Sequence, residues 1–337
     1  MKFPSGSHGP FLIAEIGGNH EGDFDTAIRL TDLAIAAGAD AVKFQIYYGD
    51  TLVSARESPE RHAHFTRFEL TPAQHLSLAD RVIAAGRLYV ASVWDIEAFN
   101  WVDPVVSAYK IGSGDLTALP FLRAAASTGR PLILSTGMAD IAEVTLAVEY
   151  IRTCQSGYQD PRMLAVLQCT SMYPIGPADA HLSVMQALKA LDVTVGYSDH
   201  TIGWRALEVA AAMGAQILEF HFTDRKQGRS FRDHQLSLDG EDLRSLVRAL
   251  DEISMLKGVP EKRPLPVEIE NDHLDSFRRA VYPSRVIEIG EVLTEHNLCV
   301  LRPNHGIDAR EYYQLMGHRA RRRLLRHEQL DWQDVER

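Results

Sequence analysis

The chain has 337 residues, a length that predicts either two domains or one large α/β barrel with a small additional module. Hydrophobic residues make up 45% and charged residues 24%, which excludes a disordered chain. The formal charge of -10 excludes a broad basic surface for nucleic acid, and no apolar run reaches the roughly 18 residues of a membrane helix.

Two patterns alternate along residues 1–256. Short apolar runs predict strands at 11–16, 40–46, 88–93, 107–111, 131–135, 163–169, 193–198 and 216–222. Ala/Leu-rich stretches with helical spacing predict helices at 25–37, 72–85, 118–128, 140–154, 183–191, 203–213 and 239–256. Eight strand–helix units in about 250 residues predict a TIM barrel, that is, a (β/α)8 α/β fold. A doubly wound open sheet is the alternative, but its early GxGxxG signal is missing.

The composition changes after residue 256. Residues 257–277 hold three prolines and many charges, which predicts a linker. Residues 278–337 form a short module with strand-like runs, too small to bury much core of its own. Its basic run, RARRR at 319–323, is interpreted as a solvated or substrate-facing surface in a chain of negative charge.

The three cysteines are few and odd in number. Cys154, Cys169 and Cys299 form no CxxC pair, and the first ten residues lack the apolar stretch of a secretion signal. A reduced, cytoplasmic protein without a disulfide framework is therefore expected. Cys169 is expected to be packed in the interior, because no base is identifiable beside it.

Polar residues stand at or just beyond the ends of the predicted barrel strands, where TIM-barrel active sites lie. Lys43 and Gln45 are two positions apart in one strand and therefore point to the same side. The other strand ends carry Glu15, Asn19, His20, Lys110, Ser113, Asp115, Ser135, Thr136, Thr170, Ser171, Tyr173, Ser198, Asp199, His200, His221 and Thr223.

The side chains of two lysines in barrel strands cannot easily reach solvent, because parallel strands are covered on both faces. Burying an unpaired ammonium group costs several kcal/mol unless an anion meets it. Lys43 and Lys110 are therefore expected to bind an anion such as a phosphate with a nearby carboxylate. The alternative is an internal salt bridge with Glu15 or Asp115.

His200 and His221 end consecutive strands, which lie about 4.8 Å apart, so both imidazoles can reach one ion. Two histidines with oxygen ligands suit Mn²⁺, Co²⁺ or Zn²⁺. The alternative is two core histidines bonded to backbone carbonyls. Asp199 and Asp233 are candidates for supporting or base roles, with a surface ion pair as the alternative. These residues together predict a metal-assisted barrel enzyme that acts on an anionic, phosphate-bearing substrate.

Several strings in the chain resemble those of one enzyme family. AEIGGNHEGD, DAVKFQ, YKIGSGDL, LILSTGM, LQCTSMYP, GYSDHTIG, LEFHFTDR and RDHQLSL are similar to motifs of the sialic acid synthase family. RRAVYPSRVIEIGEVLTEHNLCVLRP resembles that family's C-terminal antifreeze-like (SAF) domain. Members condense phosphoenolpyruvate with an N-acetylated mannosamine-type sugar and release phosphate, and the resemblance extends over nearly the whole chain.

The resemblance implies a role for each matching residue. Phosphoenolpyruvate would be held by Lys43, Lys110, Ser113, Ser135, Ser171 and Ser198. A Mn²⁺ or Mg²⁺ ion would be held by His200 and His221. The sugar would be contacted by Gln45, Asp115, Tyr173 and Arg302, with Glu15 and Asp233 as proton-transfer groups. Arg302 would reach the active site of a partner subunit, which implies a domain-swapped homodimer.

This chain departs from the family pattern at three places. Phe220 replaces a basic residue before His221, SFR precedes Asp233 in place of glycine-proline, and PNHG follows Arg302 in place of PGNG. These changes touch the metal ligand and the sugar end, so the acceptor sugar is the open question. N-acetylmannosamine, which gives N-acetylneuraminate, is the first expectation. The deoxy diacetamido sugars that lead to legionaminate or pseudaminate are the second.

Two other classes of function remain as alternatives. A metal-dependent barrel aldolase or hydrolase would act without phosphoenolpyruvate. A non-catalytic protein that binds sugar phosphates would tolerate changes at Lys43, Lys110 and His221. Phosphate release from phosphoenolpyruvate separates both from a synthase.

Overall fold

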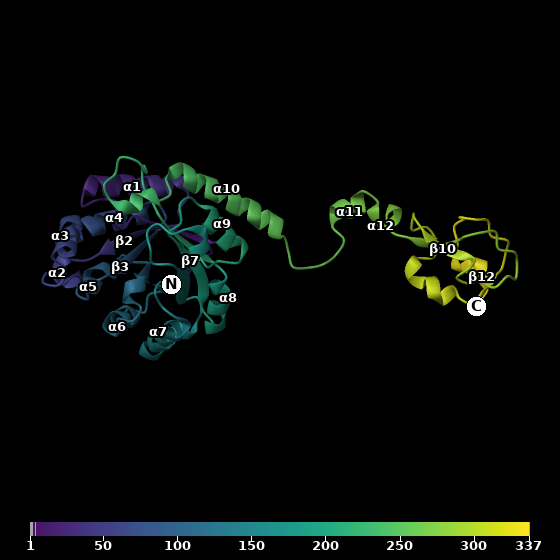
Figure 1. Ribbon diagram of the computed structural model, residues 1–337, viewed down its shortest axis with the longest axis horizontal. Helices are drawn as coiled ribbons and strands as arrows, with labels where there is room; N and C mark the ends of the chain where they lie inside the picture. Colours follow the sequence, from purple (N-terminus) through teal and green to yellow (C-terminus); the bar gives the residue numbers. More distant parts are fainter. Residues whose placement is uncertain (1–2, 4, 337) are drawn as a thin grey trace. The chain divides into compact units, whose positions relative to one another are not determined.

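The computed structural model describes residue 3 and residues 5–336, and it divides into two compact units, Met1–Gly258 and Val259–Arg337. The first unit is a closed barrel of eight parallel strands, with helices around it (Figure 1), which confirms the predicted fold. The strands are β1 (Phe11–Glu15), β2 (Ala41–Ile46), β3 (Leu88–Val93), β4 (Ala108–Ile111), β5 (Leu132–Ser135), β6 (Leu164–Cys169), β7 (Thr194–Asp199) and β8 (Ile217–His221). Strand β8 closes the barrel on β1, with Glu15 opposite His221.

Seven helices correspond to the predicted ones. They are α1 (Phe24–Ala37), α4 (Pro72–Ala84), α6 (Leu119–Ser127), α7 (Ile141–Cys154), α8 (Val184–Leu188), α9 (Arg205–Ala212) and α10 (Gly240–Lys257). Side-chain caps fix several starts; the Asp140 carboxylate, for example, accepts from the amides of Ala142 and Glu143 at the start of α7. Among the described residues, none of the helices combines the length and apolar character that crossing a bilayer requires.

Three short helices between strands were not predicted: α2 (Gly49–Leu52), α3 (Pro59–Phe68) and α5 (Ala98–Val102). The sequence of α3, PERHAHFTRF, is mostly polar and shows no sustained apolar stripe. Only Phe68 of this helix is fully buried. A helix that rests on so few apolar contacts leaves a weak periodic signal.

The inward face of the barrel changes from apolar to polar along each strand. Its lower layers contain Phe11, Ile13, Val90, Ile133 and Leu167, which form their own buried cluster. Side chains two positions apart point to the same side, so continuing along the strands brings other inward residues to the carboxyl end. These are Glu15, Lys43, Ser92, Lys110, Ser135, Ser198 and Glu219, all buried. The second apolar cluster lies between the strands and the surrounding helices.

The second unit has its own core and two small antiparallel sheets. Strand β9 (Ala280–Pro283) pairs with β10 (Leu298–Leu301), and β11 (Arg319–Ala320) pairs with β12 (Val335–Glu336). Val281, Ile287, Leu293, Leu315 and Leu330 are among its buried core residues. The segment expected as a linker contains two short helices, α11 (Pro266–Glu270) and α12 (His273–Ser276). Pro266 stands at the first position of α11, where a missing N–H costs no helical hydrogen bond.

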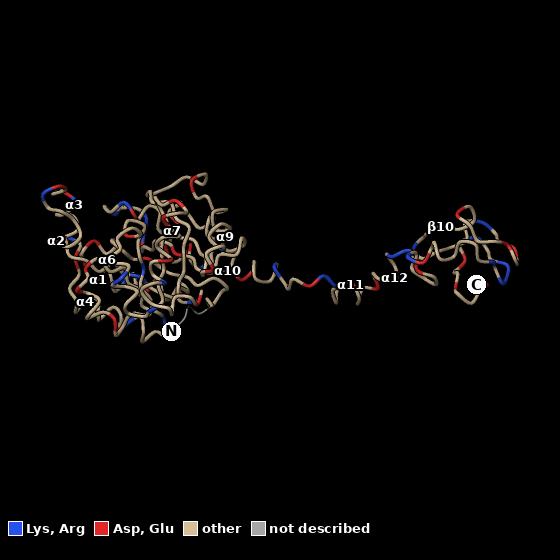
Figure 2. Tube along the Cα trace, turned by 90° about the horizontal axis from the view of Figure 1, so that it is seen from below, with Lys and Arg blue, Asp and Glu red and all other residues tan. Residues whose placement is uncertain are grey.

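Acidic and basic positions are interspersed along the trace of each unit (Figure 2). The basic residues at 319–323 are likewise accompanied by acidic residues. Arg322 donates to Asp334 and Glu328, and Arg323 donates to Glu288. These partners balance part of the positive charge of the run.

Candidate active site at the carboxyl end of the barrel

A cavity of about 870 Å³ opens at the carboxyl ends of the strands. It brings together the residues to which the family resemblance gave a role within the first unit: Glu15, Lys43, Gln45, Lys110, Ser113, Asp115, Ser135, Ser171, Tyr173, Ser198, His200, His221 and Asp233. Arg302 belongs to the second unit, where its guanidinium group donates to the Phe277 carbonyl at 2.7 Å. A smaller cavity of about 360 Å³ lies at the opposite ends of the strands and contains none of the predicted residues.

Both buried lysines have carboxylate partners. Lys43 is ion-paired with Glu15, the alternative considered from the sequence, and Glu219 Oε2 lies 3.9 Å from its Nζ. Lys110 Nζ lies 3.3 Å from Glu219 Oε1, so Glu219 takes the place that the sequence suggested for Asp115. Burial opposes the charge of Lys43, but Glu15 and Glu219 outweigh it and raise its pKa. Burial likewise opposes the charge of Glu219, but the two lysines and Ser198 outweigh it and lower the pKa of that carboxyl.

Glu219 is a residue that the sequence analysis missed. It is 5% exposed and lies between the two lysines, and it accepts a hydrogen bond from Ser198 at 2.8 Å. Its signal was present in the sequence, because it stands two positions before His221 in one strand and therefore points the same way. The rule that places Lys43 and Gln45 on the same side of their strand also places Glu219 and His221 on the same side of theirs.

The serine hydroxyls gather at the ends of four strands. Ser113 Oγ accepts from the Gly137 amide at 3.0 Å, which ties the loop after β4 to the loop after β5. A side chain at Gly137 would meet Ser171 and Ser113 within 2.9 Å, so this close approach requires glycine. Within the part of the chain that the structure describes, the buried hydroxyl of Ser135 has no hydrogen-bond partner. Such an unsatisfied buried group is typical of a site that binds a polar ligand.

The two histidine rings lie side by side, with centroids 5.4 Å apart. His200 Nδ1 is 2.7 Å from the Thr170 carbonyl, so it carries the proton and leaves Nε2 as a free lone pair. Burial and then the nearby His221 lower the pKa of His200 to about 3, so its imidazole is neutral. His221 Nδ1 is buried and, among the described residues, has no hydrogen-bond partner. The two rings therefore lie close together, and each has a nitrogen that no described residue contacts by a hydrogen bond.

Asp233 lies beside these histidines, on the short 3-10 helix η5 (Arg232–Gln235) after β8. Its Oδ2 is 3.8 Å from His221 Nδ1, too long for a hydrogen bond. Arg232 Nε donates to Asp233 Oδ1 at 3.2 Å, and its guanidinium group lies 4.9 Å from the centre of the Tyr173 ring. Arg232 was not among the predicted residues. Asp199 instead bonds to Tyr197 and Thr201 and does not line the cavity.

An aromatic and apolar wall borders the outer part of the cavity. Leu52, Val53 and Phe65 come from the region of α2 and α3, and Phe231 comes from the loop after β8. The rings of His64 and Phe231 stack with centroids 5.7 Å apart, so α3 contacts the loop that carries Asp233. This wall was not predicted, because α2 and α3 were not recognised as helices.

Comparisons with known proteins find a matching family model for each of the two units. Residues 30–262 match the NeuB family and residues 278–336 match the SAF domain. An uncharacterised protein of Methanocaldococcus jannaschii is 36% identical over 89% of this chain and 87% of its own length. The N,N'-diacetyllegionaminic acid synthase of Legionella pneumophila is 34% identical over 97% and 94%. The crystal structure of N-acetylneuraminic acid (sialic acid) synthetase from Leptospira borgpetersenii in complex with citrate is 31% identical, with a TM-score of 0.73 over 81% and 95% of the two chains.

Proposed function

The chain belongs to the NeuB family, and we propose that it joins phosphoenolpyruvate to an N-acetylated mannosamine-type sugar, forming a nonulosonic acid and phosphate. The observation that carries the proposal is the cluster of two buried lysines, two carboxylates and two histidines on one rim of the barrel. A cavity that only bound a sugar would not require this combination of buried charges, which is costly to maintain.

The lysine end of the cavity suits phosphoenolpyruvate. Lys43 and Lys110 supply the positive charge, and Ser113, Ser135 and Ser171 supply hydroxyl groups around it. Because water is largely excluded at this depth, two ammonium groups stabilise the charge that develops on a departing phosphate more strongly than they would in bulk water. Glu219 accepts a hydrogen bond from Ser198 and lies within ion-pair distance of both lysines, which orients them.

The histidine end fits a divalent metal ion. The free Nε2 of His200 and the unpaired Nδ1 of His221 are donor atoms without another partner among the described residues. No group of three His, Cys, Asp or Glu side chains suited to a metal was found in the described part of the chain, so the two imidazoles would need further ligands of another kind, such as oxygen atoms of water or substrate. Imidazole with oxygen ligands favours Mn²⁺ over Mg²⁺. A bound ion would act as a Lewis acid on the aldehyde of the open-chain sugar.

The reaction forms one carbon–carbon bond and breaks one carbon–oxygen bond. C3 of phosphoenolpyruvate supplies the electron pair to the aldehyde carbon, and the aldehyde oxygen takes up a proton. Water adds to the positive centre left at C2 and loses a proton. The bond from C2 to the phosphate oxygen then breaks, the phosphate leaves with the electron pair, and the C2 hydroxyl becomes a ketone as its proton passes to the phosphate. Glu15, at the end of β1, and Asp233, on η5, are the carboxylates proposed to move these protons.

N-acetylmannosamine is the first candidate acceptor, which makes the product N-acetylneuraminate. The likeness to the Leptospira synthetase supports it. A deoxy diacetamido sugar is the second candidate, and the apolar wall supports that alternative. Leu52, Val53, Phe65 and Phe231 offer a surface that suits a methyl group in place of a hydroxymethyl group.

The proposal includes a homodimer in which Arg302 of each chain completes the site of its partner. The resemblance of the second unit to the SAF domain supports it. Arg302 carries a guanidinium group suited to a carbonyl oxygen, such as that of an N-acyl group.

The test is phosphate release from phosphoenolpyruvate with Mn²⁺, measured across N-acetylmannosamine and its deoxy diacetamido relatives. Release that requires both a sugar and the metal is expected, and the sugar that supports it identifies the product. His221→Ala and a chelator are the controls, and each should abolish release. Folded, metal-loaded protein that releases no phosphate with any sugar would contradict the proposal and favour another barrel chemistry or a binding role.

A further inference from the structure

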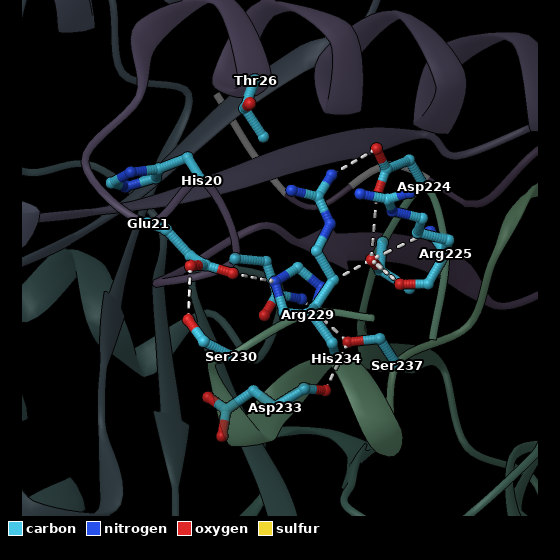
Figure 3. Close-up of polar contacts among 12 residues, drawn as sticks. His20, Glu21, Thr26, Asp224, Arg225, Arg229, Ser230, Asp233, His234 and Ser237 are labelled. Atoms are coloured by element: carbon cyan, nitrogen blue, oxygen red, sulfur yellow. Dashed lines mark hydrogen bonds and ion pairs between the residues drawn. The ribbon is translucent and has the colours of Figure 1, made fainter. Parts of the chain in front are cut away.

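A partly buried polar network joins the loop after β1 to the loop after β8 (Figure 3). The Glu21 carboxylate accepts from the Ser230 hydroxyl at 2.7 Å through one oxygen, and its other oxygen is 3.2 Å from His234 Nε2. These contacts connect residues more than 200 positions apart in the chain. Glu21, Ser230 and His234 do not line the cavity, so none of them belongs to the site described above.

His234 is fully buried and is the neighbour of Asp233 in η5. In Figure 3 the His234 ring points toward Glu21, while the Asp233 carboxylate points away from this network. Two consecutive residues of a tight 3-10 turn share one rigid backbone segment. Fixing the His234 ring therefore also fixes the direction in which Asp233 points.

The hydrogen bonds of His234 assign its tautomer. Burial lowers the pKa of His234, so the imidazole is neutral and carries a single N–H. The Glu21 carboxylate can only accept, which places that proton on Nε2. Nδ1 lies 2.6 Å from the Thr223 hydroxyl at the end of β8, and that hydroxyl also contacts the Arg225 carbonyl at 2.9 Å. Both ring nitrogens of His234 therefore have a partner, Glu21 in the loop after β1 and Thr223 at the end of β8.

A second tie in the same region supports the backbone of η5. The Asn19 side-chain amide donates to the Ser237 hydroxyl at 2.8 Å, and that hydroxyl donates to the Asp233 carbonyl at 2.7 Å. Asn19 comes from the same turn after β1 as Glu21. The His234 ring and the Asp233 carbonyl are therefore both linked to the turn that follows Glu15, the other carboxylate proposed to move protons.

We propose that Glu21 and His234 are positioning residues that hold Asp233 beside His221, and the inference rests on the proposed function. We call the contacts of Glu21 with Ser230 and His234 the clasp. The clasp affects the end of the cavity where Asp233 lies and where the sugar is proposed to bind. It does not contact the lysines at the other end. Opening it lets η5 shift, and a shift of about 1 Å at a reacting group can reduce a rate on the order of 100-fold.

Glu21→Ala opens the clasp, and Glu21→Gln is the conservative variant that keeps an oxygen acceptor. For Glu21→Ala we expect a fall on the order of 10- to 100-fold in kcat/KM for the sugar, with KM for phosphoenolpyruvate unchanged. Glu21→Gln should recover most of this loss. Glu208→Ala is the matched control, because Glu208 is as exposed as Glu21 (24% against 25%) and its ion pair with Arg205 lies on α9, away from the cavity.

The decisive measurement places Glu21→Ala in an Asp233→Asn background. A residue that acts through Asp233 adds no further loss once that carboxylate is gone, whereas a general structural role adds its full effect. Additive losses, or Glu21→Ala activity equal to that of the Glu208→Ala control, would overturn the proposal.

Hydrogen exchange tests the clasp without activity. In the full-length protein, Glu21→Ala should speed amide exchange across residues 222–239, and Glu208→Ala should not. If the wild-type protein released no phosphate with any sugar, the proposed function would fail, and this exchange measurement would still decide whether the clasp orders η5. Equal exchange in the two variants would overturn the clasp.

Discussion

Lys43 and Lys110 each have a buried carboxylate as a partner, so the four charges at the base of the cavity balance within the barrel. An anionic substrate that binds both lysines must share them with Glu15 and Glu219. The stability of the cluster and its affinity for phosphate are therefore separate quantities, which can be changed independently. Removing one charge disturbs both, whereas removing a matched pair disturbs mainly the affinity.

The first prediction uses this separation. Lys110→Met leaves Glu219 buried beside an apolar side chain, and we expect it to lower the free energy of unfolding by about 3–5 kcal/mol and to abolish phosphate release. Lys110→Met with Glu219→Gln should recover most of the stability, because the amide still accepts from Ser198. It should recover none of the activity. Urea unfolding and phosphate release measure the two effects, and equal stability of the single and double variants would contradict the prediction.

The sequence predicted individual site residues wherever strand alternation and a family motif agreed. Lys43 and Gln45 are examples, since both alternate inward at the end of one strand. Glu219 was not predicted because its strand, QILEFHF, is mostly apolar and resembles a strand buried on both faces. Arg232 and Phe231 were not predicted either, because they lie on a loop whose path depends on distant contacts such as the clasp. Loop positions are set by tertiary structure and carry little periodic signal.

At the scale of elements, the eight strands agree with their predicted runs to within one residue at each end. Strands buried on both faces are continuous apolar runs, and the helices that cover them need one apolar stripe, so both signals are strong. Helices α2 and α3 lack these signals because their side chains form part of the cavity wall and do not pack into the barrel core. The shape of the outer part of the cavity could therefore not be predicted from the sequence pattern.

Helix α4 carries a buried histidine that makes the barrel sensitive to acid. His75 is 2% exposed, and burial, with a smaller contribution from His20, lowers its pKa from 6.5 to about 3. Between these values the unfolded chain binds more protons than the folded protein, so stability falls as the pH falls from 6.5 toward 3. One such group contributes up to about 1.4 kcal/mol per pH unit.

The second prediction follows for His75→Asn, which keeps a polar atom near the Tyr89 hydroxyl that His75 contacts at 3.3 Å. We expect the loss of unfolding free energy between pH 6 and 4 to become smaller by about 1.4 kcal/mol per pH unit. Urea unfolding at several pH values measures this slope. His296→Asn, an exposed histidine of the second unit, is the control and should leave the slope unchanged. An unchanged slope in His75→Asn would show that His75 is protonated in the folded protein.

At the scale of the whole molecule, the chain contains two units that each bury a separate apolar core. All the predicted site residues except Arg302 lie in the first unit. A ligand that binds this site therefore stabilises the first unit directly, because ligands that bind only the folded state shift the unfolding equilibrium. This linkage gives a test of the metal site that does not depend on turnover.

The third prediction concerns Mn²⁺ and the thermal unfolding of the full chain. If His200 and His221 hold the ion, Mn²⁺ at 100 times its dissociation constant adds about 2.7 kcal/mol to the stability of the folded site. Calorimetry should show a higher unfolding temperature with Mn²⁺ and its reversal by a chelator. The double variant His200→Asn, His221→Asn should unfold at the same temperature with and without Mn²⁺, while His296→Asn should respond as the wild type does. A shift that persists in the double variant would place the ion elsewhere, since the two imidazoles contribute the only donor nitrogen atoms proposed for it.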